Sequence, residues 1–316
     1  MTRTTAFDSA DVHCWHSGDG ALCLTMTGER PSITADVLAG FERALAIAES
    51  NFRMLIIGAE HKDFGYGADL GDSVTAAAAG NVTPLDGVLD HYQQTMLALR
   101  HAGVPTIAVT KGVAISGACE VLMHCTRVVA APKSPIGLLE TSIGVLPGGG
   151  GVKEMVWRAA VRADGGNLTP ALERAFDVLA TARIVYARDA AALDLLTTQD
   201  VISDAADLVA VAKDVGHSLQ RAGYRPPPRH PMIRVAGSDG LARLRTGQQD
   251  ATLTAHQLCV NDHLAQVLCG GDAPPRNVTE ATLLDLERRH FLTLAQMPAT
   301  QARFAHLRAT GTVLRN

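Results

Sequence analysis

Two glutamates stand in sequence settings that suit proton transfer. Glu120 lies in "KGVAISGACEVL" (111–122), a run of small and apolar residues, and Glu140 lies in "SPIGLLETSIGVLPGGGG" (134–151), between an apolar run and a glycine-rich turn. A carboxylate in an apolar, partly dry pocket can act as a general base or a general acid. Each glutamate is therefore a candidate catalytic residue.

Glu120 also has a structural interpretation. A glutamate near a helix start can complement the helix dipole or close a capping box. A capping box with Ser116 as the N-cap needs Glu or Gln three residues later, where Cys119 stands, and Glu120 is four residues away. The spacing disfavours the capping box and leaves the other interpretations open.

Two segments are suited to presenting backbone N–H groups to a ligand. The segment "HKDFGYGADL" (61–70) follows the strand-like "RMLIIG" and places glycines on both sides of Tyr66, just before Ala68. Gly117 stands at the start of the helix that carries Glu120, where the N–H groups and the positive dipole end attract negative charge. Both segments predict a site for an anion or a developing negative charge.

The elements that must position these residues alternate between strand and helix. Strands are predicted at 21–26, within 52–60 and at 105–110, and helices at 34–50 and 89–103, the first with apolar residues near a 3.6-residue period. This alternation predicts an α/β fold with largely buried, parallel strands. The small-residue-rich segment 71–88 is predicted to be a mobile surface loop that includes a helical turn, and such loops often line substrate pockets.

A break in composition occurs at "RAGYRPPPRHP" (221–231). Three consecutive prolines cannot continue a helix and are typical of an extended linker. We therefore predict a core over residues 1–220, a proline-rich linker over 221–232 and a C-terminal helical region over 233–316. In that region 248–271 and the stretch from Thr279, an N-cap candidate, have helical patterns.

Composition narrows the class of protein. The 316 residues are 47% hydrophobic, and 28 basic against 32 acidic residues give a net charge of −4, which provides no basic field for nucleic acid or anionic lipid. Six scattered cysteines without a CxxC pair indicate a reducing compartment and no zinc site. The absence of a signal-peptide core and of eighteen consecutive apolar residues predicts a soluble, cytoplasmic protein.

Three blocks in this order resemble the enoyl-CoA hydratase/isomerase (crotonase) superfamily over roughly residues 20–200: "FGYGADL" (64–70), "KGVAISGACEVLMHCTRVVAA" (111–131) and "SPIGLLETSIGVLPGGGGVKEM" (134–155). The resemblance implies a ClpP/crotonase-like fold, which is a ββα spiral core followed by helices for subunit contact and pocket closure. It also implies a homotrimer or a dimer of trimers. The stretches "LLDLERRHFLTL" (283–294) and "ATGTVLRN" (309–316) look like the hydratase end of long-chain multifunctional proteins. Those proteins also carry a 3-hydroxyacyl-CoA dehydrogenase, which this sequence lacks and a separate partner could supply.

The resemblance assigns roles to individual residues. In the family two backbone N–H groups form an oxyanion hole for a thioester oxygen, and the matching positions are Ala68 and Gly117. Hydratases of the family use two glutamates, which match Glu120 and Glu140; we assign Glu120 to water activation and Glu140 to α-proton delivery, and the reverse or a shared assignment stays open. The substrate is a coenzyme A thioester, and no cofactor or metal is expected. Further substrate contacts are expected from Lys62, Tyr66, Gly67, Asp69, Leu70, Ser116, Pro147 and Gly148.

The sequence departs from the family pattern at two places. Ser116 and Ala118 flank Gly117 where many relatives have three glycines, and Tyr66 replaces a small residue, so that its ring either faces the core or narrows the thioester pocket. The run "PGGGG" (147–151) lacks a following Lys-Ser/Thr, and no G-x-G-x-x-G follows an N-terminal strand, which disfavours nucleotide and nicotinamide chemistry.

Enoyl-CoA hydration, giving a 3-hydroxyacyl-CoA, is the expected activity; fatty acid β-oxidation, amino-acid degradation and aromatic degradation all use this step. Two alternatives stay open. One is a double-bond isomerase, for which a single glutamate suffices. The other is a non-catalytic subunit that binds acyl-CoA or a separate dehydrogenase. The length and branching of the acyl group have no readable code in the sequence.

Overall fold

The computed structural model describes residues 3–229, 231–247 and 252–316. Its contacts divide the chain into two compact units, each built from three segments. The first unit comprises Met1–Asp69, Gln94–Gly137 and Ile184–Arg229, and the second comprises Leu70–Gln93, Leu138–Arg183 and His230–Asn316. The chain passes from one unit to the other five times. The last passage, after residue 229, falls within the predicted linker 221–232, and the four earlier ones lie inside the predicted core 1–220.

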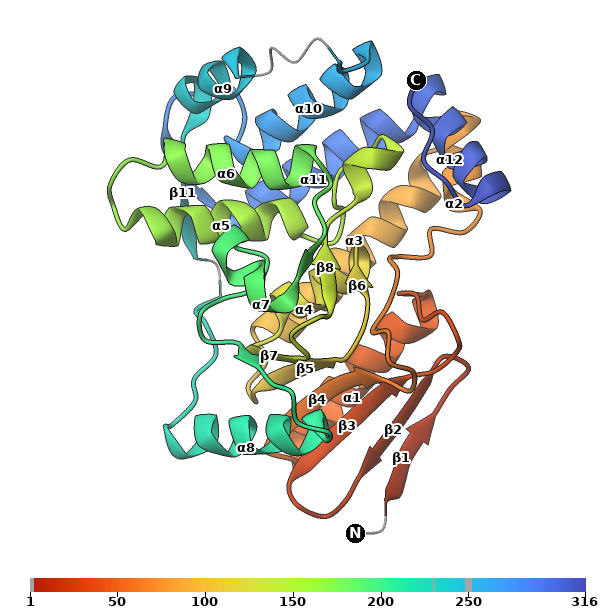
Figure 1. Cartoon of the computed structure of the whole chain (residues 1–316), viewed down its shortest axis with the longest axis vertical. Coiled ribbons are helices and arrows are strands. Elements are labelled where there is room, and N and C mark those ends of the chain that lie inside the picture. The colour runs from red at the N-terminus through yellow and green to blue at the C-terminus, as the bar shows by residue number, and fades with distance from the viewer. Residues whose placement is uncertain (1–2, 230, 248–251) are drawn as a thin grey trace. The chain divides into compact units, whose positions relative to one another are not determined.

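A seven-stranded sheet forms the centre of the first unit, in the order β1-β2-β3-β4-β5-β7-β10 (Figure 1). The strands from β3 onward pair in parallel, and β1 and β2 add to the β3 edge as antiparallel strands. The predicted buried strands at 21–26, 52–60 and 105–110 are confirmed as β3, β4 and β5. The bounds are β1 Thr4–Asp8, β2 Val12–His16, β3 Ala21–Met26, β4 Met54–Ala59, β5 Thr106–Thr110, β7 Arg127–Ala130 and β10 Val201–Ile202.

Two helices cover opposite faces of this sheet. Trp15 belongs to a buried cluster that includes Leu208 and Ala212 of α8 (Leu208–Arg221). Side chains alternate along a strand, so Val12 points to the other face. A β-carbon at Gly40 of α1 (Ala35–Asn51) would lie 2.8 Å from the Val12 side chain, which places α1 on that face. Thr34, where the predicted helix begins, is the N-cap of α1, because its hydroxyl accepts the Val37 N–H.

A second, smaller sheet in the first unit leads into the glutamate-bearing segments. Strand β6 (Ala114–Ile115) pairs in parallel with β8 (Pro135–Gly137), which pairs with β9 (Val185–Tyr186). Helix α4 (Gly117–His124) follows β6 after one residue. The short helix α7 (Ala187–Ala190) and a 3₁₀ turn, η2 (Ala191–Leu193), follow β9.

The second unit is mainly helical. Its elements are α2 (Ser73–Ala78), the first half of α3 (Thr83–Arg100), the 3₁₀ turn η1 (Glu140–Ile143), α5 (Gly151–Ala163), α6 (Thr169–Ala180), α9 (Gly237–Thr246), α10 (Ala255–Leu268), α11 (Glu280–Ala295) and α12 (Pro298–Thr310). The strands β11 (Met232–Val235) and β12 (Arg276–Thr279) pair antiparallel. Helices α5 and α6 lie side by side (Figure 1).

The structure changes three sequence predictions. The segment 71–88 is largely helical, because α2 uses its alanine-rich run and α3 begins at Thr83 rather than 89. The stretch from Thr279 has the predicted N-cap, whose hydroxyl accepts the Thr282 N–H, but it divides into α11 and α12 where Pro298 occupies the first turn of α12. The helix predicted over 248–271 is shorter, since α10 begins at Ala255, and residues 248–251 lie outside the described residues.

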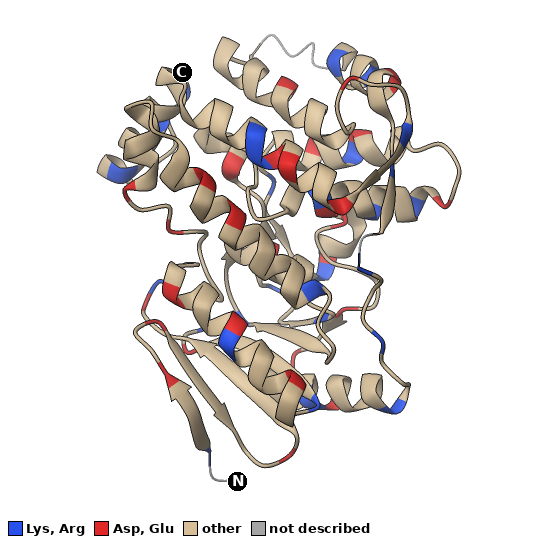
Figure 2. Cartoon of the chain, turned by 180° about the vertical axis from the view of Figure 1, so that it is seen from behind, with Lys and Arg blue, Asp and Glu red and all other residues tan. Residues whose placement is uncertain are grey.

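Charges of both signs are interspersed along the helices (Figure 2). Among the described residues, no helix is long and apolar enough to cross a membrane. The six cysteines are free thiols, four of them buried, and burial raises the pKa of Cys14, Cys125 and Cys269 to about 12.

Candidate active site

In the first unit, the backbone of Ala68 is oriented by a short parallel bridge to Ile33. Ile33 donates its N–H to the Gly67 carbonyl at 2.8 Å, and Asp69 donates to the Ile33 carbonyl at 3.0 Å. In such a bridge the N–H of the middle residue points away from the partner strand. Within the part of the chain that the structure describes, the Ala68 N–H has no acceptor, so it is available to a ligand.

The Ala68 segment lies against the start of α4. Gly67, at φ +134°, has no side chain, and a β-carbon there would lie 3.2 Å from the Ser116 β-carbon and 3.9 Å from the Gly117 nitrogen. The two segments also pair directly, because Ile115 donates its N–H to the Gly65 carbonyl at 3.1 Å. The structure thus brings together the two residues predicted for the oxyanion hole.

Ser116 holds an unusual backbone conformation just before Gly117. Its φ of 54° and ψ of −132° lie in a region that favours glycine, and its N–H donates to the Gly137 carbonyl of β8 at 2.8 Å. The first N–H groups of α4 come directly after this turn, and the first N–H groups of an α-helix have no acceptor within the helix itself. Strain of this kind, at about 1–3 kcal/mol, is typical of functional sites.

Glu120 is 1% exposed and lies in the first turn of α4. Its N–H donates to the Ser116 carbonyl at 3.1 Å, and its own carbonyl accepts from the His124 ring at 2.7 Å. The Ser116 side chain makes no capping bond to the helix. A capping box therefore does not explain Glu120, as its spacing predicts, and the structure leaves a buried carboxylate on the helix that presents Gly117.

The loop that carries Ala68 is tied to the α4 segment by Asp63. Its carboxylate accepts from the Tyr66 hydroxyl at 2.6 Å and from the Val113 N–H at 2.9 Å. Burial alone would raise the pKa of Asp63, but these hydrogen bonds outweigh it and lower that pKa. Sequence reasoning missed this residue, since nothing in its local pattern distinguishes it from a solvated loop aspartate.

The other residues predicted to contact substrate in this unit have different surroundings. Tyr66 is half-buried, with the Arg30 guanidinium 4.7 Å from its ring centre, so the ring does not enter the core. Asp69 is exposed. Lys62 lines a separate cavity of about 330 Å³ on the α8 side, together with Trp15, Ile56, Val109 and Val209. The residues lining that cavity do not include Ala68, Gly117 or Glu120.

In the second unit, Glu140 opens the 3₁₀ turn η1 and is 8% exposed. The turn is closed by a hydrogen bond from the Val145 N–H to the Glu140 carbonyl at 3.1 Å, and Gly144 ends it at φ +90°. The Thr141 hydroxyl donates to the Leu179 carbonyl of α6 at 2.6 Å. The second predicted catalytic carboxylate is therefore buried on a short, well-anchored turn.

The glycine-rich run after η1 is a packing element. A β-carbon at Gly148 would lie 2.8 Å from the Leu89 side chain and 3.1 Å from Phe291. The Gly148 carbonyl accepts from Gln93, which also donates to the Leu284 carbonyl, both at 3.1 Å. Pro147 is buried as well. The close approach of these side chains explains the requirement for glycine at position 148. Leu70, the remaining predicted contact, also belongs to this unit and is half-buried.

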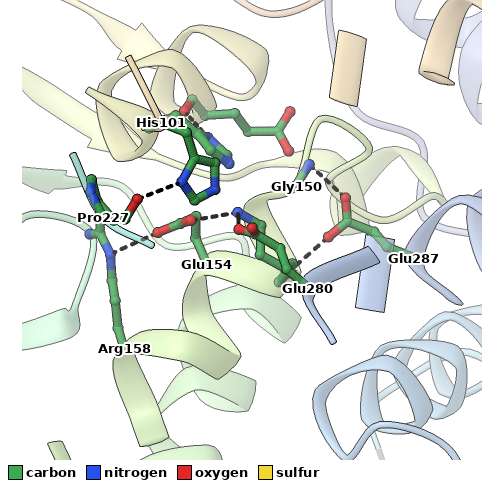
Figure 3. A network of polar contacts seen from close by, with 10 residues as sticks. His101, Gly150, Glu154, Arg158, Pro227, Glu280 and Glu287 are labelled. Atoms are coloured by element: carbon green, nitrogen blue, oxygen red, sulfur yellow. Dashed lines mark hydrogen bonds and ion pairs between the residues drawn. The ribbon is translucent and has the colours of Figure 1, made fainter. Parts of the chain in front are cut away.

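Glu287 of α11 caps α5 from outside the helix. Its two oxygens accept the N–H groups of Gly150 at 2.7 Å and of Lys153 at 3.0 Å (Figure 3). Gly150, the N-cap residue of α5, has no side chain to do this. The Lys153 ammonium group lies 2.6 Å from Glu154 and 2.8 Å from Glu280, all three side chains being buried. This ion-pair cluster and the Glu287 cap fix the start of α5. They therefore also fix the end of the glycine-rich run that connects η1 to α5.

The described residues contain no group of three or more His, Cys, Asp or Glu side chains arranged to hold a metal ion. The groups suited to binding an oxygen anion are backbone N–H groups, at Ala68 and at the start of α4. The groups suited to proton transfer are the buried carboxylates of Glu120 and Glu140.

These features define a protein of the crotonase fold, and solved structures match it over nearly the whole chain. The enoyl-CoA hydratase of Bacillus halodurans has a TM-score of 0.64 at 17% identity, covering 94% of this chain and 100% of that one. The enoyl-CoA hydratase of Rhodobacter sphaeroides has a TM-score of 0.65 at 17% identity, covering 97% and 92%. The predicted fold class is confirmed.

The sequence comparisons agree with the fold. Residues 20–165 match the model of the enoyl-CoA hydratase/isomerase family. A Bacillus subtilis protein named "Probable 3-hydroxyacyl-CoA dehydrogenase" is 31% identical over 306 residues, covering 95% of this chain and 38% of its own length. A peroxisomal fatty acid beta-oxidation multifunctional protein of Oryza sativa subsp. japonica is 27% identical over 178 residues, covering 54% and 22%. The chain thus spans well under half the length of these relatives.

Proposed function

We propose that the protein is an enoyl-CoA hydratase that adds water to a trans-2-enoyl-CoA and yields a 3-hydroxyacyl-CoA. The observation that carries the proposal is the Ala68 N–H, which has no acceptor among the described residues and lies on a segment packed against the Gly117 start of α4. Such paired donors stabilise the negative charge that a thioester oxygen gains as the enolate forms. One donor of this kind contributes ~10²–10³ in rate in acyl-transfer enzymes.

In this proposal the two glutamates divide the proton transfers. Glu120 takes a proton from the water that attacks the β-carbon, and Glu140 delivers a proton to the α-carbon. Burial of both carboxylates supports the assignment, because an apolar, partly dry setting suits a carboxyl group to general acid–base catalysis. The name of the Oryza sativa relative, a peroxisomal fatty acid beta-oxidation multifunctional protein, supports a substrate from fatty acid oxidation. A homotrimer or dimer of trimers, and a separate dehydrogenase partner, stay predictions.

The test is the loss of conjugated-thioester absorbance with crotonyl-CoA and with a longer 2-enoyl-CoA. We expect Glu120→Gln and Glu140→Gln each to lower kcat by at least ~10²-fold, with unchanged circular dichroism. Glu173→Gln is the matched control, because that glutamate pairs with Arg243 on the exposed surface. Its activity should equal that of the parent.

The outcomes separate this proposal from its alternatives. Full activity in the Glu140→Gln variant on a 3-enoyl-CoA, with no hydration by the parent, would replace the hydratase with the isomerase. A parent without turnover on any chain length, but with a co-purified dehydrogenase, would favour the non-catalytic subunit.

A further inference from the structure

Helix α12 contacts the backbone of the turn that carries Glu140. Arg303 donates from Nη1 to the carbonyl oxygens of Thr141 at 3.3 Å and Ser142 at 3.4 Å. Thr300, one turn earlier on the same helix, donates its hydroxyl to the Gly144 carbonyl at 2.9 Å. The carbonyls of three of the four residues after Glu140 are thus held by two side chains of one helix, α12, which lies near the C-terminus of the chain (Figure 1).

Both side chains are buried, and other groups fix them in place. Arg303 is 2% exposed and Thr300 is 0% exposed. The guanidinium also donates to Gln257 Oε1 of α10 at 2.9 Å and to Asn316 Oδ1 at 2.8 Å. The His256 ring lies 2.9 Å from the Thr300 hydroxyl. Neither side chain can change rotamer without breaking several hydrogen bonds.

The acceptors around Arg303 are all neutral. They are two backbone carbonyls and two side-chain amides, and the described residues contain no ion pair to this guanidinium. Burying a cation without a carboxylate is unfavourable, and burial lowers the pKa of Arg303. If the position served stability alone, an apolar side chain of similar volume would give an equal or more favourable free energy of folding. The planar fork of arginine is instead suited to holding several oxygens in a defined arrangement.

Gly144 shows how closely α12 approaches the turn. A β-carbon at this position would lie 2.8 Å from Thr300 Oγ1 and 3.0 Å from His256 Nε2. The guanidinium stands at the carbonyl end of the 3₁₀ turn, where the backbone dipoles favour a positive charge. The turn is therefore clamped at the end opposite to Glu140, and the Val145 N–H to Glu140 carbonyl bond links the two ends.

We propose that Arg303 and Thr300 are positioning residues for Glu140, which set the place of its carboxylate by clamping the carbonyls of its turn. The effect of the clamp on catalysis rests on the proposed function. The hydrogen bonds that form the clamp do not depend on that function. Misplacing a catalytic group by about 1 Å can cost ~10² in rate. Loss of the clamp should therefore lower kcat and leave substrate binding, which other groups provide, nearly unchanged.

The first measurement is amide hydrogen exchange, without substrate, in a peptide that covers residues 140–146. We expect Arg303→Met and Thr300→Val to speed exchange of the Gly144 and Val145 amides by at least ~10-fold. Arg308→Met is the matched control on α12, because Arg308 is exposed and donates to the Gly71 carbonyl instead of the turn. If the amides exchange at the parent rate in the Arg303 variant, the proposal that Arg303 clamps the turn is wrong.

The second measurement is steady-state hydration of crotonyl-CoA by the same variants. We expect Arg303→Met to lower kcat by ~10–100-fold with KM within about threefold, and Arg303→Lys to restore part of the loss. If exchange of the turn amides is faster but kcat stays within twofold of the parent value, Arg303 does not position Glu140 for catalysis. The hydratase assignment would survive that result. A parent without hydration would overturn the proposed function instead, and the exchange data alone would then decide whether α12 clamps the turn.

Discussion

Replacing Ser116 by glycine should stabilise the first unit. The backbone of Ser116 lies at φ 54° and ψ −132°, which costs a residue with a β-carbon about 1–3 kcal/mol. Glycine removes this strain but adds about 0.4–1 kcal/mol of conformational freedom to the unfolded chain. The net gain is about 0.5–2 kcal/mol in the free energy of unfolding.

The assay is urea unfolding followed by the fluorescence of Trp15, which is buried in the first unit, in a Trp157→Phe background. With a slope of about 2 kcal/mol per molar urea, the midpoint should rise by about 0.3–1 M at unchanged slope. Hydration activity should stay within a few-fold of the parent, because the N–H of residue 117 is retained.

The same substitution at a serine with ordinary helical backbone angles should lower the free energy of unfolding instead of raising it. Ser218 is exposed within α8, and Ser218→Gly should lower the free energy of unfolding by about 0.5 kcal/mol through helix propensity. If Ser116→Gly lowers the midpoint as Ser218→Gly does, the strain argument is refuted.

Two further predictions concern the other parts of the candidate site. Asp63→Asn should destabilise the first unit by about 1–2 kcal/mol at pH 7, because the hydrogen bonds that lower the pKa of Asp63 favour its charged form. The folded pKa lies below the unfolded value of about 3.9, so this stabilisation is complete above about pH 5 and is lost as the pH falls through the folded pKa. Urea midpoints of parent and variant should converge as the pH falls below the folded pKa of Asp63, and a difference that grows toward acid would contradict the assignment. Gly148→Ala should destabilise the second unit by about 1–3 kcal/mol, since its β-carbon would lie 2.8 Å from Leu89. Gly87→Ala, in an open position of α3, should gain about 0.5–1 kcal/mol instead, and equal effects of the two substitutions on a urea midpoint read from Trp157 would refute the packing explanation.

Much of the architecture could be predicted from short-range patterns. The apolar strands β3, β4 and β5 and the threonine N-caps at 34 and 279 are encoded by residues within a few positions of each other, so the sequence determined them directly. The spacing of Glu120 from Ser116 also disfavoured a capping box, and the Ser116 side chain indeed makes no capping bond. The motif order implied the fold, which the comparisons confirm, and a resemblance to the family whose model matches residues 20–165. The helical start of α3 was missed because Gly87 and Pro84 weaken its local pattern, while burial of Leu85 and Leu89 stabilises it.

The supports of the candidate site were decided by tertiary structure alone. Asp63 is 50 residues from the Val113 N–H that it accepts, and Glu287 is 137 residues from the Gly150 N–H. Arg303 lies more than 160 residues from the turn that it holds. No local pattern encodes such contacts, because they depend on which backbone groups the folded chain leaves without a hydrogen-bond partner in their own element. The sequence thus determined which groups are proposed to do the chemistry, and the tertiary structure decided which distant side chains hold them in place.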